Sequence, residues 1–175
     1  YIIYGPLFNG NTTVLYEGKP VGTPDASAFW RVIAEHKVKV LFTAPTAFRA
    51  IKKEDPEGKL LKQFDLSCLD ALYLAGERCD PPTLDWAEKQ LNIPVIDHWW
   101  QTETGWPICA SCRGLEDPQI VSGSPGRAVP GYVLEVLDTE QKPVETGDIG
   151  ALVIRLPLPP GTFTTLWNAL ERFQS

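Results

Sequence analysis

Short apolar segments alternate with helix-like segments in the first half of the sequence, and this alternation constrains the fold more than any other feature. Residues 38–42, 71–75 and 93–96 are rich in the apolar and β-branched side chains that favour strands. Amphipathic segments lie between them, and Pro45 and Pro81 suit the first turn of a helix. Because parallel strands need crossover connections, this order predicts an α/β fold with a mainly parallel sheet flanked by helices.

Two further elements are predicted nearer the N-terminus. Residues 13–16 are apolar and β-branched and lie between glycines, which predicts a short buried strand. A helix should follow, with Thr23 as its cap and Pro24 at its first position. The residues expected on its inner face recur at helical spacing: Ala26, Phe29, Trp30, Ile33 and Ala34.

The pattern changes after Gly123. Residues 132–137 and 150–155 read as two strands joined by a polar turn, which predicts an antiparallel pair. Residues 156–161 contain three prolines and predict a rigid connector. We therefore expect residues 1–122 to form part of the α/β unit and residues 123–175 to begin a small antiparallel β subdomain.

Composition excludes several classes of function. The net charge of -6 argues against a nucleic-acid-binding surface, which needs clustered Lys and Arg. No apolar run approaches the roughly 18 residues that would span a bilayer. Of the four cysteines, only Cys109 and Cys112 have the two-residue spacing of a zinc or redox site, and zinc would need two further ligands. Reduced intracellular thiols are the better interpretation.

The loop of residues 97–105 is the strongest candidate for a functional site. It follows the strand predicted at 93–96 and combines hydroxyls, a carboxylate and two indoles. Ligands of open α/β sheets bind at the carboxyl ends of strands. Adjacent tryptophans also occur in ordinary cores, and Thr102 to Gly105 is a sequence that turns use, so these residues alone leave a structural role open.

Several ordered motifs together resemble adenylate-forming acyl-CoA synthetases, specifically the short-chain branch of acetyl-CoA and propionyl-CoA synthetases. The resemblance covers nearly the whole chain, and its motifs lie at residues 4–7, 12–18, 43–47, 76–77 and 99–105. The resemblance implies an ATP-dependent ligase in which an acid and ATP form an acyl-adenylate and pyrophosphate. Coenzyme A then displaces AMP to give a thioester. Residues 1–122 would be part of the adenylation subdomain.

The resemblance also implies roles for individual residues. Thr102 would contact a nucleotide phosphate, and Glu103 would bind Mg²⁺, which one or two carboxylates and phosphate oxygens commonly hold. Trp100 would close the acyl pocket to all but short acids. Gly76, Glu77 and Arg78 would form the adenine-binding turn, with Arg78 in place of the family's usual proline. The remaining nucleotide contacts would come from the site loop: Asp97, His98, Trp99, Trp100 and Gln101.

Two details bear on substrate and on false matches. Acetate-specific relatives tend to carry valine where this chain has Ala75, so the acyl pocket would have space for one more methylene, which favours propionate over acetate. Residues 146–148 imitate the family's ribose-binding Thr-Gly-Asp, but they precede the strand of residues 150–155. We expect them to form a hairpin turn.

The family's phosphate loop, its ribose-binding residues and its mobile C-terminal domain do not occur in these residues, so we expect a fragment that is inactive alone. The alternatives are an adenylating relative with another acceptor, such as a peptide-synthetase adenylation domain, and a truncated non-catalytic protein that binds nucleotide or partners. The expected partners are small molecules: a short-chain carboxylate, ATP and CoA. The resemblance favours the mitochondrial matrix in a eukaryote or the cytoplasm in a bacterium.

Overall fold

The largest unit of the fold is a three-stranded parallel sheet. The computed structural model describes residues 2–115 and 120–174. The strands are β1 (Val40–Thr43), β2 (Ala71–Leu74) and β3 (Val95–Asp97), in the order β1-β2-β3. In the register, Leu72 of β2 pairs with Leu41 of β1 and with Val95 of β3. The predicted α/β class and the parallel sheet are therefore confirmed.

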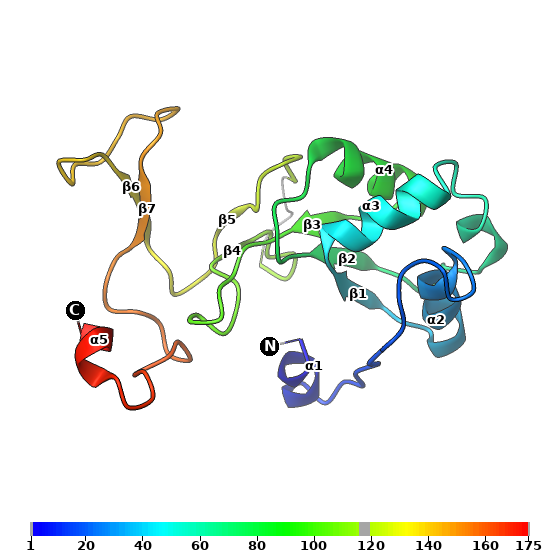
Figure 1. Cartoon of the computed structure of the whole chain (residues 1–175), viewed down its shortest axis with the longest axis horizontal. Helices are drawn as coiled ribbons and strands as arrows, with labels where there is room; N and C mark the ends of the chain where they lie inside the picture. The colour runs from blue at the N-terminus through cyan, green and yellow to red at the C-terminus, as the bar shows by residue number, and fades with distance from the viewer. Residues whose placement is uncertain (1, 116–119, 175) are drawn as a thin grey trace.

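Two helices make the crossovers and cover one face of the sheet. α3 (Pro45–Glu54) connects β1 to β2, and α4 (Pro81–Leu91) connects β2 to β3. They lie side by side over the strands (Figure 1). Their apolar positions bury a continuous core with the inner residues of the strands: Phe48, Ile51, Leu72, Leu74, Leu84, Ala87 and Val95. Burial of such side chains stabilises the fold by about 1.5 to 3 kcal/mol each.

Side-chain hydrogen bonds to the backbone set where two of the helices begin. One predicted start is confirmed, and the other was wrong. Asp80 caps α4 as expected, because its carboxylate accepts the Thr83 N–H at 3.1 Å. The helix predicted from Thr23, α2 (Ala28–His36), begins later, after Ser27. Asp25 explains the delay, since its carboxylate accepts the Ser27 N–H at 2.8 Å and holds the preceding segment in a turn. Trp30 of α2 contacts Phe48 of α3 edge-on, with ring centroids 5.8 Å apart.

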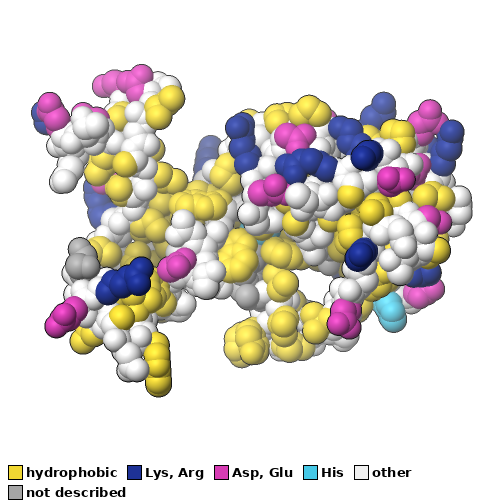
Figure 2. All heavy atoms as spheres, viewed as in Figure 1, with side chains coloured by type: hydrophobic (Ala, Val, Ile, Leu, Met, Phe, Trp, Pro, Cys, Tyr) yellow, Lys and Arg dark blue, Asp and Glu magenta, His cyan; other side chains and the backbone are white. Residues whose placement is uncertain are grey.

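The strand predicted at residues 13–16 does not form. These residues have no regular structure, and Val14 and Leu15 are 41% and 69% exposed. A strand needs a neighbour for its backbone hydrogen bonds, and no described strand pairs with this segment. The preceding short helix α1 (Tyr4–Phe8) also buries none of its residues. Hydrophobic side chains are exposed over it (Figure 2).

The second half of the chain contains small antiparallel pairs. β6 (Leu134–Leu137) pairs with β7 (Ala151–Ile154), as predicted, in a hairpin that stands apart from the parallel sheet (Figure 1). β4 (Cys109–Ala110) pairs with β5 (Arg127–Ala128) between the two units. A second cluster, formed by Ile108, Cys109, Val129 and Tyr132, packs against the base of the hairpin.

The connection between β6 and β7 contains the turn expected at residues 146–148. The Asp148 N–H donates to the Glu145 carbonyl at 3.1 Å, and Gly147 has a φ of +107°. That backbone region suits glycine, so the Thr-Gly-Asp sequence serves turn geometry here.

The chain ends in a short helix, α5 (Leu170–Gln174). Within the described residues, no helix is both long and apolar enough to cross a membrane.

Candidate functional site

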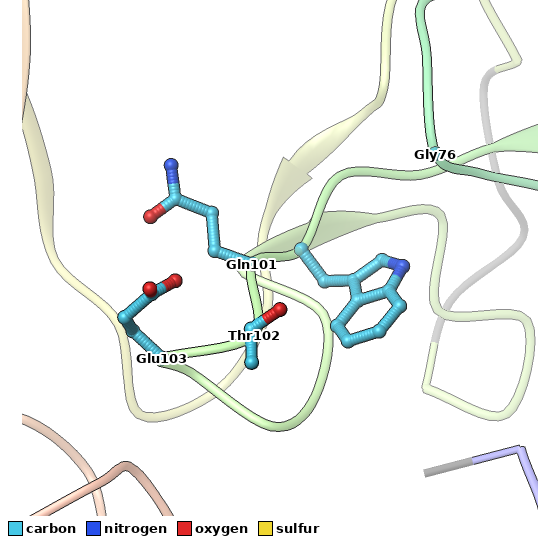
Figure 3. Close-up of a pocket in the computed structure, with 5 residues that line it drawn as sticks. Gly76, Gln101, Thr102 and Glu103 are labelled. Atoms are coloured by element: carbon cyan, nitrogen blue, oxygen red, sulfur yellow. The ribbon is translucent and has the colours of Figure 1, made fainter.

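A cavity of about 530 Å³, wide open to solvent, lies where the chain leaves β2 and β3. Gly76, just after β2, lines one side, and the loop of residues 100–103, just after β3, lines the other (Figure 3). The two segments meet because β2 and β3 are parallel neighbours, so their carboxyl ends reach the same edge of the sheet. The lining residues are Gly76, Trp100, Gln101, Thr102 and Glu103.

The polar side chains of the site loop diverge. The Glu103 carboxylate extends on the same side of the loop as the Gln101 side chain (Figure 3). The Thr102 hydroxyl points to the other side, toward Gly76. All three residues are exposed. An extended ligand with several acceptor oxygens could therefore contact the hydroxyl at one point and place a cation near the carboxylate at another.

Thr104 holds this loop in shape, a role that the sequence did not predict. It is buried, and its hydroxyl accepts the Gln101 N–H at 3.1 Å. The same oxygen lies 2.9 and 3.0 Å from the carbonyl oxygens of Gln101 and Trp106. From the segment after the connector, the Phe163 N–H donates to the Glu103 carbonyl at 3.0 Å. Thr104 and Phe163 therefore hold the backbone that carries the Glu103 carboxylate.

The turn after β2 presents backbone rather than side chains to the cavity. Gly76 has a φ of +101°, which glycine adopts without strain. Glu77 turns away from the cavity, since its Oε1 atom accepts the Thr46 N–H at 2.9 Å and a guanidinium N–H of Arg49 at 3.0 Å. The guanidinium of Arg78 lies beside Gly123, away from the lining residues.

Three other predicted site residues lie outside the cavity lining: Asp97 and Ala75 are buried, and Trp99 is half-buried. Asp97 accepts the Cys79 N–H at 3.1 Å, and burial raises the pKa of its carboxyl. Trp99 is hydrogen-bonded through its backbone to Cys109 and packs on the second cluster. Ala75 is 4% exposed and directly precedes Gly76. None of the three lines the cavity.

His98 is enclosed by aromatic rings. Phe42 and Tyr73 contact its ring edge-on, with centroid distances of 5.3 and 5.7 Å. The side chain is buried, and burial lowers the pKa of His98 to about 4. The imidazole is therefore neutral at pH 7. Its position behind the cavity argues against a role as general base.

Replacement of His98 by glutamine should make the free energy of unfolding less dependent on pH between about 6.5 and 4. In the native state its pKa is about 4, against an ordinary value of 6.5, so between these values only the unfolded state takes up the proton. Native stability is therefore retained above pH 6.5 and falls by up to roughly 3 kcal/mol as the pH drops toward 4. Chemical denaturation at several pH values would measure this fall in the free energy of unfolding. His36→Gln, on the exposed end of α2, should keep the wild-type slope, and an unchanged slope in His98→Gln would refute the assignment.

The site offers one carboxylate to a metal ion. Within residues 2–115 and 120–174, no cluster of three or more His, Cys, Asp or Glu side chains could hold a metal by itself. The four cysteines are free thiols, Cys109 and Cys112 included. Glu103 fits the different arrangement that Mg²⁺ uses with nucleotides, in which one or two carboxylates act together with phosphate oxygens and water.

Comparison with known proteins identifies the family of the chain. A profile of the AMP-binding enzyme family matches residues 1–167. The mitochondrial acyl-CoA synthetase short-chain family member 3 of Mus musculus is 55% identical over 175 residues, which cover 99% of this chain and 26% of that protein. The propionate–CoA ligase of Escherichia coli is 44% identical over 174 residues, which cover 99% of this chain and 27% of that ligase.

A solved structure shares the fold. The anthranilate CoA ligase AuaEII, in complex with anthranoyl-AMP, superimposes with a TM-score of 0.75 at 26% sequence identity. The match covers 93% of this chain and 29% of that one. The chain thus spans between a quarter and a third of the length of these relatives. Because the family profile covers nearly all of its residues, the chain belongs to the AMP-binding enzyme family.

Proposed function

We propose that the chain is part of an ATP-dependent short-chain acyl-CoA ligase. Such an enzyme joins a carboxylate to the α-phosphate of ATP with release of pyrophosphate, and then transfers the acyl group to coenzyme A. The observation that carries the proposal is the cavity itself, where a glycine turn, a hydroxyl, a carboxylate and an indole line one space. The relatives named as acyl-CoA synthetases and as propionate–CoA ligase support the same class.

Each lining residue has a proposed task. The backbone at Gly76 allows close approach of the adenine, and the Thr102 hydroxyl donates to a phosphate oxygen. Glu103 binds Mg²⁺, which would stabilise negative charge that develops on the phosphates. Trp100 closes the acyl pocket, and Gln101 adds a polar contact to the nucleotide. The other predicted nucleotide-binding residues hold these groups in place from behind: Glu77, Arg78, Asp97, His98 and Trp99.

The isolated chain should be catalytically inactive. None of the residues that line the cavity is cationic, so no described side chain there offsets the charge of a triphosphate. We propose that residues 1–122 belong to the adenylation subdomain and residues 123–175 to the start of a β subdomain. The full-length protein would act in the mitochondrial matrix of a eukaryote or in the cytoplasm of a bacterium.

Rates of the full-length protein with different acids test both the proposed function and the proposed substrate. We expect propionate-dependent release of pyrophosphate, with propionate preferred to acetate because Ala75, which is buried directly before Gly76, is small. Ala75→Val should remove space for about one methylene, which is worth about 0.8 kcal/mol. The kcat/KM ratio of propionate to acetate should then fall about fourfold. Absence of acid-dependent pyrophosphate release in the wild type would refute the ligase assignment.

A further inference from the structure

Arg49 connects α3 to the turn of residues 76–80, whose first residue, Gly76, lines the cavity. Its Nε donates to Asp80 at 2.6 Å, and its Nη1 donates to Glu77 at 3.0 Å. Its Nη2 donates to the carbonyl of Arg78 at 3.2 Å. The guanidinium therefore uses all three of its nitrogens on one short segment. A planar fork suits this task, and a lysine ammonium cannot reproduce it.

The two carboxylates that Arg49 contacts also bind the starts of two helices. Glu77 accepts the Thr46 N–H at 2.9 Å, in the first turn of α3. Asp80 accepts the Thr83 N–H at 3.1 Å, in the first turn of α4. Helix N-termini favour negative charge, so both carboxylates are held by a helix start and by the guanidinium together. The turn is thereby fixed to α3 and to α4.

The charges of Asp80 and Arg49 are maintained over a wide pH range. The hydrogen bond from Arg49, with a further one from Thr83, lowers the pKa of Asp80 to about 2. The hydrogen bond to Asp80 in turn raises the pKa of the Arg49 guanidinium. Asp80 and Arg49 are therefore both ionised at every pH at which an enzyme of this kind would be assayed.

Gly76 has no support of its own. It bears no side chain, and a Cβ built at this position would meet no atom within 4 Å. The residues that follow it are held by Arg49 and by the hydrogen bond from the Cys79 N–H to Asp97, and they position Gly76. We propose that Arg49 is a positioning residue, which holds the turn of residues 76–80 in the shape that binds the nucleotide. This inference rests on the proposed ligase function.

Substitution of Arg49 in the full-length protein tests the inference with two readouts. Arg49→Ala should raise the KM for ATP about tenfold and leave kcat little changed, because a loosened wall weakens nucleotide binding more than chemistry. Hydrogen exchange of the backbone amides in residues 76–80, measured without ligand, should become faster. Arg49→Lys keeps the charge without the fork, and we expect an intermediate KM for ATP.

Lys52→Ala is the matched control. Lys52 lies one turn further along α3, and its Nζ donates to the Pro82 carbonyl at 2.6 Å, so the control removes an α3 to α4 contact outside the turn. It should leave the KM for ATP and the exchange in residues 76–80 as in the wild type. Equal effects in Lys52→Ala, or a wild-type KM for ATP in Arg49→Ala, would overturn the inference. A wild type with no acid-dependent activity would instead refute the function, and the exchange data would still decide whether Arg49 holds the turn.

Discussion

Glu103→Gln should reduce acid-dependent pyrophosphate release by the full-length protein about 100- to 1000-fold. The substitution keeps the shape of the side chain and removes its charge. Glu103 provides the carboxylate among the residues that line the cavity, so no neighbouring acid in that lining can replace it. The concentration of Mg²⁺ that gives half the maximal rate should rise as well. Initial rates measured across a Mg²⁺ titration would give both values.

Glu54→Gln provides the control for a general effect of lost charge. Glu54 is exposed at the end of α3 and lies outside the cavity lining, so the variant should keep the wild-type rate and Mg²⁺ response. Because Glu103 is exposed and its carbonyl is held by Phe163 through backbone atoms, the substitution should leave the fold intact. A Glu103→Gln enzyme with a normal Mg²⁺ response would show that another group binds the metal.

The elements that could be predicted from the sequence are those with local signals. α4 has a cap, a proline at its first position and apolar side chains at helical spacing, and its predicted start at Pro81 is confirmed. The three strands of the parallel sheet are apolar segments bounded by turns. The hairpin of β6 and β7 has two such segments joined by a polar turn, and its antiparallel pairing is confirmed.

The errors occurred where a distant or competing interaction decides the outcome. Residues 13–16 have the composition of a strand, but composition cannot supply a neighbouring strand. The start of α2 depends on whether the carboxylate of Asp25 bonds to Ser27 or leaves the backbone free for a helix. Propensity and spacing do not separate these choices.

The sequence predicted where the candidate site lies better than it predicted how its side chains are arranged. The sequence placed Thr102 and Glu103 at the end of a strand, and the structure places both on the cavity with Gly76. It could not show that Glu77 faces α3, because its partner Arg49 is 28 residues away and no spacing rule joins them. The assigned roles of these residues stay predictions until variants are measured.

Trp100→Ala should let the full-length enzyme accept longer acids. Trp100 is the largest side chain on the cavity, and its removal leaves room for the end of a longer chain. Hexanoate has three more methylenes than propionate, and each buried methylene is worth about 0.8 kcal/mol. The kcat/KM ratio of hexanoate to propionate should therefore rise about 100-fold, partly because propionate loses its contact with the indole. Rates with the series from acetate to octanoate would measure the change.

Trp167→Ala makes the same replacement at a surface position. Trp167 is 91% exposed and lies outside the cavity lining, so its loss should leave the acid preference unchanged. If Trp100→Ala lowered the rates with all acids by one common factor, the indole would support the loop without forming the acyl pocket. If the variant instead gained activity with aromatic or amino acids and still rejected hexanoate, the site would belong to an adenylating enzyme of a different substrate class. A selective gain with longer straight-chain acids is the result that only a pocket closed by this indole explains.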